Sequence, residues 1–159
     1  MLAESRATKS ATLRAIPFRI GADVLNGKSR NNSVISRWRH NAAYGDAEAQ
    51  YKLGLAYIRG RRSEEDKAEG ARWLQRAAEQ GHVGGQLNTG VAHALGTGVL
   101  QDAVMAHMWF NLAAAKGNER ARENRVKIVR RMSREQVAEA QRLARNWKPD
   151  LSYWSDPQL

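Results

Sequence analysis

The chain has 159 residues, of which 42% are hydrophobic, and a formal net charge of +10 at pH 7. It has no cysteine, which excludes disulfides, thiolate catalysis and thiolate metal sites. No apolar run in the sequence approaches the ~18–20 residues that a membrane-spanning helix needs.

The charge is unevenly distributed along the chain. Residues 1–44 carry a net charge of +6, residues 45–115 of −1, residues 116–148 of +7 and residues 149–159 of −2. Such basic ends are typical of contact with an anionic surface, and they are equally typical of a solvated polar face.

Residues 1–33 differ from the rest of the chain. They are rich in Ser, Thr, Arg and Asn, and Pro17 interrupts their one apolar stretch, Leu13 to Ile20. A secretory signal needs an uninterrupted apolar region, so we do not expect one here. The segment has the composition of a disordered basic arm or of an organellar transit peptide. We favour the arm and a cytoplasmic location, with organelle targeting as the alternative.

From residue 34 the apolar residues recur at helical spacing. The pattern predicts helices over residues 34–44, 46–60, 66–80, 81–95, 102–116, 118–132 and 133–148. Ser133 and Gln136 have the spacing of a capping box at the start of the last helix. Glycines mark the expected helix ends, and acidic or amide side chains mark the expected starts: Gly45, Gly60, Gly81, Gly96 and Gly117, then Asp46, Asp66, Asp102 and Asn118.

Two stretches of the chain match each other at an offset of 36 residues. Over residues 45–80 against 81–116 there are nine identities without a gap, where composition alone gives roughly three. The pairs are Gly45/Gly81, Gln50/Gln86, Gly54/Gly90, Ala56/Ala92, Gly60/Gly96, Asp66/Asp102, Trp73/Trp109, Ala77/Ala113 and Ala78/Ala114. A period of this length indicates stacked helix–turn–helix units.

We therefore predict an all-α fold, a short right-handed α-solenoid of about seven helices. A leading half-unit over 34–44 precedes repeat one (45–80) and repeat two (81–116), and a divergent capping unit covers 117–148. The repeat domain thus spans 34–148 and a tail covers 149–159. Two full units are near the minimum length for a stable array, so a homodimer or a bound partner is one way to stabilise it.

The motif from Ala49 to His82 resembles the Sel-one-like repeat (SLR) family, a relative of the tetratricopeptide repeat. Its elements are Ala49-Gln50-Tyr51-Lys52-Leu53-Gly54, Tyr57, Gly60, Asp66, Ala71, Trp73-Leu74 and Ala77-Ala78-Glu79-Gln80-Gly81-His82. The turn at residues 61–65 lacks the family's Gly-x-Gly-Val, and Thr89 and His93 depart from it in repeat two. The resemblance implies an α-solenoid that acts as an adaptor or scaffold, with no catalytic residue and no cofactor.

The matching residues are interpreted as structural. We expect Gly54 and Gly90 to allow close helix approach against Ala77 and Ala113, and Trp73 and Trp109 to stack in register. The expected packing residues are Gly45, Leu53, Gly54, Tyr57, Gly60, Trp73, Ala77, Ala78, Gly81, Gly90, Gly96, Trp109, Ala113, Ala114 and Gly117.

Neither a metal site nor an enzyme is predicted. His82 and His93 lie about three turns, or ~16 Å, apart on one helix, which is too far for one ion. His93 and His107 could approach across a hairpin, but no third ligand is evident. No nucleophile motif such as Gly-x-Ser-x-Gly occurs.

Two functions follow from these observations. The first is a protein-interaction module that binds a partner through exposed residues of the first helices, with Gln50, Lys52, Arg59 and Asn88 as candidates. The alternative is binding of nucleic acid or an anionic surface through the N-terminal arm and residues 116–148. That basic run is Arg120, Arg122, Arg125, Lys127, Arg130, Arg131 and Arg134.

Overall fold

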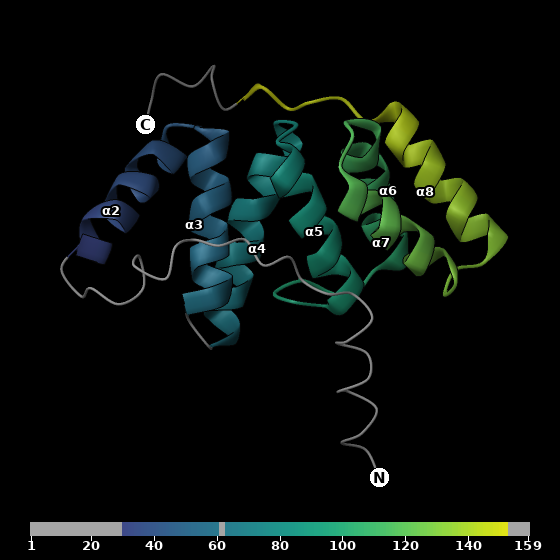
Figure 1. Cartoon of the computed structure of the whole chain (residues 1–159), viewed down its shortest axis with the longest axis horizontal. Coiled ribbons are helices and arrows are strands. Elements are labelled where there is room, and N and C mark those ends of the chain that lie inside the picture. Colours follow the sequence, from purple (N-terminus) through teal and green to yellow (C-terminus); the bar gives the residue numbers. More distant parts are fainter. Residues whose placement is uncertain (1–29, 61–62, 153–159) are drawn as a thin grey trace, which may run out of the picture.

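The computed structural model describes residues 30–60 and 63–152, and there it is a row of α-helices (Figure 1). The expected arm at residues 1–33 therefore lies almost entirely outside the described residues. The described part contains seven helices and no strand, which confirms the predicted all-α fold. They are α2 (Arg30–Ala43), α3 (Ala47–Gly60), α4 (Glu64–Glu79), α5 (Val83–Leu95), α6 (Ala103–Ala115), α7 (Glu119–Val129) and α8 (Arg134–Asn146).

We call α3, α5 and α7 the first helices of their units, and the turn that precedes each of them repeats every 36 residues. Gly45, Gly81 and Gly117 have φ of 89°, 88° and 86°, a left-handed conformation that favours glycine. The next residue caps the following helix: the Asp46, His82 and Asn118 side chains accept from the backbone N–H of Ala49, Gly85 and Ala121. The chain therefore turns in the same way before α3, α5 and α7.

The helices pack as two hairpins with additional helices at both ends. Helix α3 pairs with α4, α5 pairs with α6, and α4 packs against α5 to join the hairpins. Helix α2 packs on α3 as a leading half-unit, and α7 packs on α6. Helix α8 does not return onto α7; it lies against α6, so the last two helices do not form a third hairpin.

Helix α4 begins earlier than the sequence pattern predicts. The expected start was Asp66, but the helix runs from Glu64, and the Ser63 hydroxyl caps it by accepting from the Asp66 backbone N–H at 3.1 Å. The Asp66 carboxylate in turn accepts from the Ser63 hydroxyl at 2.8 Å. In repeat two, Asp102 is itself the cap of α6. The capping box of Ser133 and Gln136 at α8 is confirmed.

The close approach of α3 and α4 depends on two facing glycines. A Cβ on Gly54 would lie 2.8 Å from the Gly70 carbonyl oxygen and 2.8 Å from Leu74 Cγ. The expected partner Ala77 is therefore wrong, and Gly70 takes that place. In repeat two a Cβ on Gly90 would meet the Phe110 ring at 2.6 Å instead of Ala113. The counterpart lies about two helical turns before Ala77 because the helices cross near Gly70.

The two matching tryptophans do not stack on each other, contrary to the expectation from their spacing. Trp73 packs with Ala42, Leu53 and Trp38, whereas Trp109 packs with Ala78 and with α8. Each tryptophan thus lies against an alanine of the preceding second helix, and those alanines are themselves 36 residues apart. Because the two tryptophans lie one repeat apart, each ring packs in a separate hydrophobic cluster.

Helix α8 is held on α6 by aromatic packing at its end. The Trp147 ring meets the Trp109 ring edge-on at a centroid distance of 6.3 Å. The Lys116 ammonium lies 5.7 Å from the centroid of the Trp147 ring. Beyond Trp147 the chain runs back over the helix ends (Figure 1), and the Asp150 N–H donates to the Glu79 carbonyl at 2.8 Å. The C-terminal segment therefore ties α8 to both hairpins. None of the described helices has the length and apolar character needed to cross a membrane.

Candidate functional site

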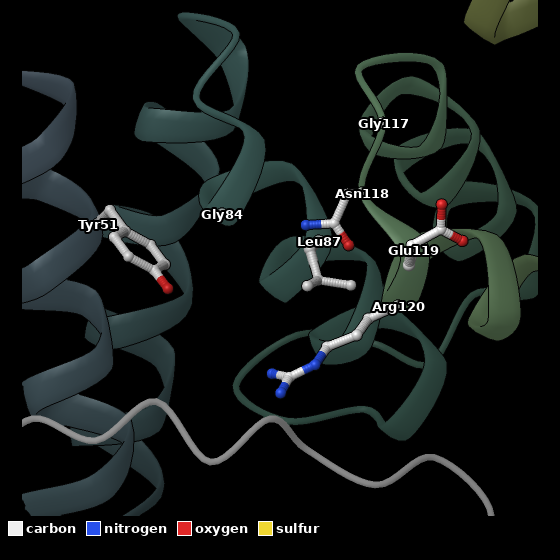
Figure 2. A pocket seen from close by; sticks show the side chains of 7 residues that line it. All are labelled: Tyr51, Gly84, Leu87, Gly117, Asn118, Glu119 and Arg120. Atoms are coloured by element: carbon white, nitrogen blue, oxygen red, sulfur yellow. The ribbon is translucent and has the colours of Figure 1, made fainter.

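Three successive first helices line one pocket. It has a volume of about 410 Å³ and opens to solvent beside α3, α5 and α7 (Figure 2). We call the surface formed by these three helices the first-helix face. The pocket is lined by Tyr51, Gly84, Leu87, Gly117, Asn118, Glu119 and Arg120.

The pocket exists because residue 84 has no side chain. Glu48, Gly84 and Arg120 occupy equivalent places in α3, α5 and α7, since each is 36 residues from the next. A Cβ on Gly84 would lie 2.9 Å from Cζ of Tyr51 and 3.1 Å from His82. Any larger residue at position 84 would therefore press on Tyr51 and fill the floor of the pocket.

Tyr51 forms one wall of the pocket. Its ring lies 4.7 Å from the His82 ring, and only 8% of the residue is exposed. Burial raises the pKa of the phenol, an effect to which the nearby Glu48 adds and which Arg59, Arg120 and a hydrogen bond with Asn88 reduce. The hydroxyl is thus protonated at neutral pH and keeps its capacity to donate a hydrogen bond.

The opposite wall carries an arginine without an acidic partner. In Figure 2 the Arg120 guanidinium extends toward the Tyr51 side of the pocket, while the Glu119 carboxylate points away from it. Glu119 is paired with Arg122 at 3.0 Å. Among the described residues no acidic side chain lies within ion-pair distance of Arg120. The rim of the pocket therefore carries uncompensated positive charge.

Beside the pocket, His82 links the two repeats. Its Nδ1 accepts from the Gly85 N–H at 3.0 Å, so the proton of the neutral imidazole is on Nε2, which lies 2.7 Å from the Glu48 carboxylate. Lys52 pairs with the same carboxylate at 3.1 Å. Burial raises the pKa of Glu48, but the hydrogen bonds to His82 and Lys52 outweigh it and leave the pKa below its usual value.

The four residues predicted to contact a partner, Gln50, Lys52, Arg59 and Asn88, differ in how exposed they are. Gln50 is 1% exposed, so the expectation that it faces a partner is wrong. Its amide donates to the Ala42 carbonyl at 3.1 Å, and its oxygen accepts from Gln80 at 2.8 Å. Gln86 makes the equivalent contact with the Ala78 carbonyl at 3.4 Å. The glutamine thus belongs to the repeat, as its identity with Gln86 could have indicated.

The other three candidates lie on or near the first-helix face. Asn88 is half-buried; it donates to the Gly84 carbonyl at 2.8 Å and hydrogen-bonds Tyr51, which places it behind the pocket wall. Lys52 is half-buried and paired with Glu48. Arg59 is exposed at the far end of α3 and does not line the pocket. Sequence reasoning listed Arg120 only within the basic run and Tyr51 only within the repeat motif, and it did not single out Gly84. All three stand at positions where the repeats differ.

The basic run of α7 and its surroundings is partly compensated. Arg122 pairs with Glu119, and Arg125 donates to the Asn111 side chain at 2.6 Å. Among the described residues, no acidic side chain pairs with the four remaining members that lie outside the pocket: Lys127, Arg130, Arg131 and Arg134. Within residues 30–60 and 63–152, no group of three His, Cys, Asp or Glu residues is placed to hold a metal ion.

The profile of one protein family, Sel1 repeat, matches residues 47–82 and 84–118. Two Sel1 repeats therefore form the middle of this chain. Each begins at a first helix and ends at the cap of the next, so the pocket lies where two Sel1 repeats and α7 meet.

A solved structure supports the same assignment. The chain is similar to a protective antigen of uropathogenic Escherichia coli strains whose crystal structure displays an SLR fold, with a TM-score of 0.74 and 29% identity. The similarity covers 82% of this chain, which spans 29% of the antigen's chain. A comparison with curated proteins found no match. Sel1 repeats generally mediate protein–protein interaction and are typically not catalytic.

Proposed function

We propose that this Sel1-repeat chain is a non-enzymatic adaptor or scaffold that binds a partner protein through the first-helix face. The observation that carries the proposal is the pocket shared by α3, α5 and α7. Apart from Gly117, which repeats Gly45 and Gly81, its lining residues differ between the repeats, while most residues that match are buried in packing or form helix ends. A surface of this kind can vary its partner without altering the array.

Site-specific crosslinking tests the proposal, and the cysteine-free sequence makes it practical. Glu119→Cys, labelled with a benzophenone maleimide, places the photoprobe at the pocket rim and leaves Arg120 in place. Arg72→Cys, exposed on the second helix α4, is the matched control. In extract of the native cell we expect a discrete protein adduct from position 119 and none from position 72. Adducts of equal yield at both positions, or none at position 119, would contradict the proposal.

Binding of nucleic acid or an anionic surface is the second candidate, favoured by the unpaired cations at Lys127, Arg130, Arg131 and Arg134. Neutralised phosphates release counterions, so such binding weakens steeply as salt rises. We expect an Arg130→Glu/Arg131→Glu double variant to elute from heparin at lower salt than the parent. Retention that disappears at moderate salt without sequence preference would indicate nonspecific charge only.

A further inference from the structure

The first-helix face changes its charge from repeat to repeat at one equivalent position. We call Glu48, Gly84 and Arg120 the 48/84/120 row. At the first position the carboxylate is already paired with Lys52 and hydrogen-bonded to His82. At the second there is no side chain, and the pocket opens. At the third there is a cation without an acidic partner among the described residues. Along the row, the charge is compensated at Glu48, the pocket opens at Gly84, and an unpaired positive charge stands at Arg120.

The surfaces around the row are suited to two kinds of contact. Leu87, 2% exposed, and the edge of the Tyr51 ring, 8% exposed, are the apolar groups at the base and the side of the pocket, and about 410 Å³ accommodates one or two side chains. The Tyr51 hydroxyl and the Arg120 guanidinium reach the same opening from opposite sides (Figure 2). Both groups are donors, and the guanidinium fork matches the two oxygens of a carboxylate.

We infer that the partner of the first-helix face presents an extended segment in which a carboxylate side chain is adjacent to an apolar one. The apolar side chain enters the space over Gly84 and Leu87, and the carboxylate accepts from Arg120. This inference rests on the proposed function and names the chemistry of its partner. A basic segment is disfavoured at the same place, because its charge would meet the unpaired guanidinium.

A titration with defined peptides tests the inference. The probes are the capped tetrapeptides acetyl-Leu-Asp-Leu-Asp-amide and acetyl-Leu-Lys-Leu-Lys-amide, added to the ¹⁵N-labelled full chain. We expect saturable shifts of the Gly84, Gly117 and Arg120 amide resonances with the acidic peptide, and at least about tenfold weaker binding of the basic peptide. Equal binding of the two peptides, or no saturable shift with either, would overturn the inference.

A charge reversal at the rim sharpens the test. Arg120→Glu should weaken the acidic peptide by about tenfold or more and strengthen the basic one, because the reversed charge now attracts lysine. Arg130→Glu, the same change at the exposed cap of α7 outside the pocket, is the matched control and should leave the preference for the acidic peptide intact. Identical behaviour of the two variants would mean that only overall charge is sensed.

The outcome is separable from that of the proposed function. If position 119 crosslinks to a partner but the crosslinked segment lacks an acidic residue, the inference fails and the adaptor assignment stands. Helix content measured by circular dichroism shows whether each variant is folded, and Arg120→Gln provides a neutral variant at the same exposed position.

Discussion

At the scale of single residues, the chain uses identical residues for packing, and the recognition we propose falls to residues that differ between the repeats. Gln50 and Gln86 show the first case, since both donate to the end of the preceding second helix. Arg120 shows the second case, because its equivalents in the repeats are Glu48 and Gly84. The repeat identities therefore indicate which residues are unavailable to a partner.

Adding one methyl group at Gly54 should destabilise the array. In Gly54→Ala the new Cβ would lie 2.8 Å from the Gly70 carbonyl oxygen and from Leu74 Cγ, so α3 and α4 must separate. We expect a loss of about 1–3 kcal/mol, measured by urea unfolding. Gly60→Ala is the control, because a Cβ there meets nothing within 4 Å. Equal midpoints for Gly54→Ala and the parent would contradict this expectation.

Stability should fall between neutral and mildly acidic pH because of His107. Burial lowers the pKa of His107, and the nearby Arg125 lowers it further. Between that folded-state pKa and the ordinary value of 6.5 the unfolded chain binds more protons. The contribution of neutral His107 to folding stability is thus complete above pH 6.5, and it is lost as the pH falls through the folded-state pKa. The free energy of unfolding changes by at most about 1.4 kcal/mol per pH unit over this interval.

The variant His107→Gln isolates this contribution, because the other three histidines remain. Thermal unfolding of both proteins from pH 7.5 to 5 should show a shallower dependence in the variant, whatever its stability at neutral pH. If the stability of the variant depends on pH as steeply as that of the parent, the loss of stability at low pH comes from other titratable groups.

At the scale of elements, the turn before each first helix is a local device that the sequence reveals in its three glycines and in two of its three caps, Asp46 and Asn118. A left-handed glycine and a capping side chain recur before α3, α5 and α7, and they act within one turn of the chain. His82 differs from Asp46 and Asn118 because it also reaches Glu48 on the preceding first helix. The cap of α5 is thus also a contact between repeats.

Replacing His82 should separate these two roles. His82→Ala removes the acceptor for the Gly85 N–H and should cost about 1 kcal/mol, whereas His82→Asn retains a capping oxygen and should recover most of that loss. Urea unfolding at pH 7.5 measures both variants. If Ala and Asn are equally destabilising, the link to Glu48 and not the cap is what His82 contributes.

At the scale of the whole molecule, the array is closed at its end by a helix that packs out of sequence order. Helix α8 lies on α6, where Trp147 covers Trp109, and the segment after it reaches back to α4. The exposed ends of α7 and α8 carry the positive charge. The first-helix face stays open beside them, as a partner-binding surface requires.

Removing the aromatic contact should release α8. We expect Trp147→Ala to lower stability by about 2 kcal/mol, less than for a fully buried tryptophan because Trp147 is half-buried. Amide exchange in α8 should accelerate more than exchange in α3 and α4. Arg145→Ala, an exposed neighbour on the same helix, is the control. Uniform acceleration throughout the array would instead indicate that α8 unfolds only with the whole molecule.

The sequence by itself determined the helices, most of their caps and the 36-residue repeat, because helical periodicity and capping act over a few neighbouring residues. It also predicted the capping box at Ser133, although it misplaced the start of α4. Only the tertiary structure decided that Gln50 points inward, that Gly54 faces Gly70, and that α8 packs on α6. It alone joined Tyr51, Gly84 and Arg120 in one pocket. Those arrangements depend on how helices cross over distances of a repeat or more, which no local pattern encodes.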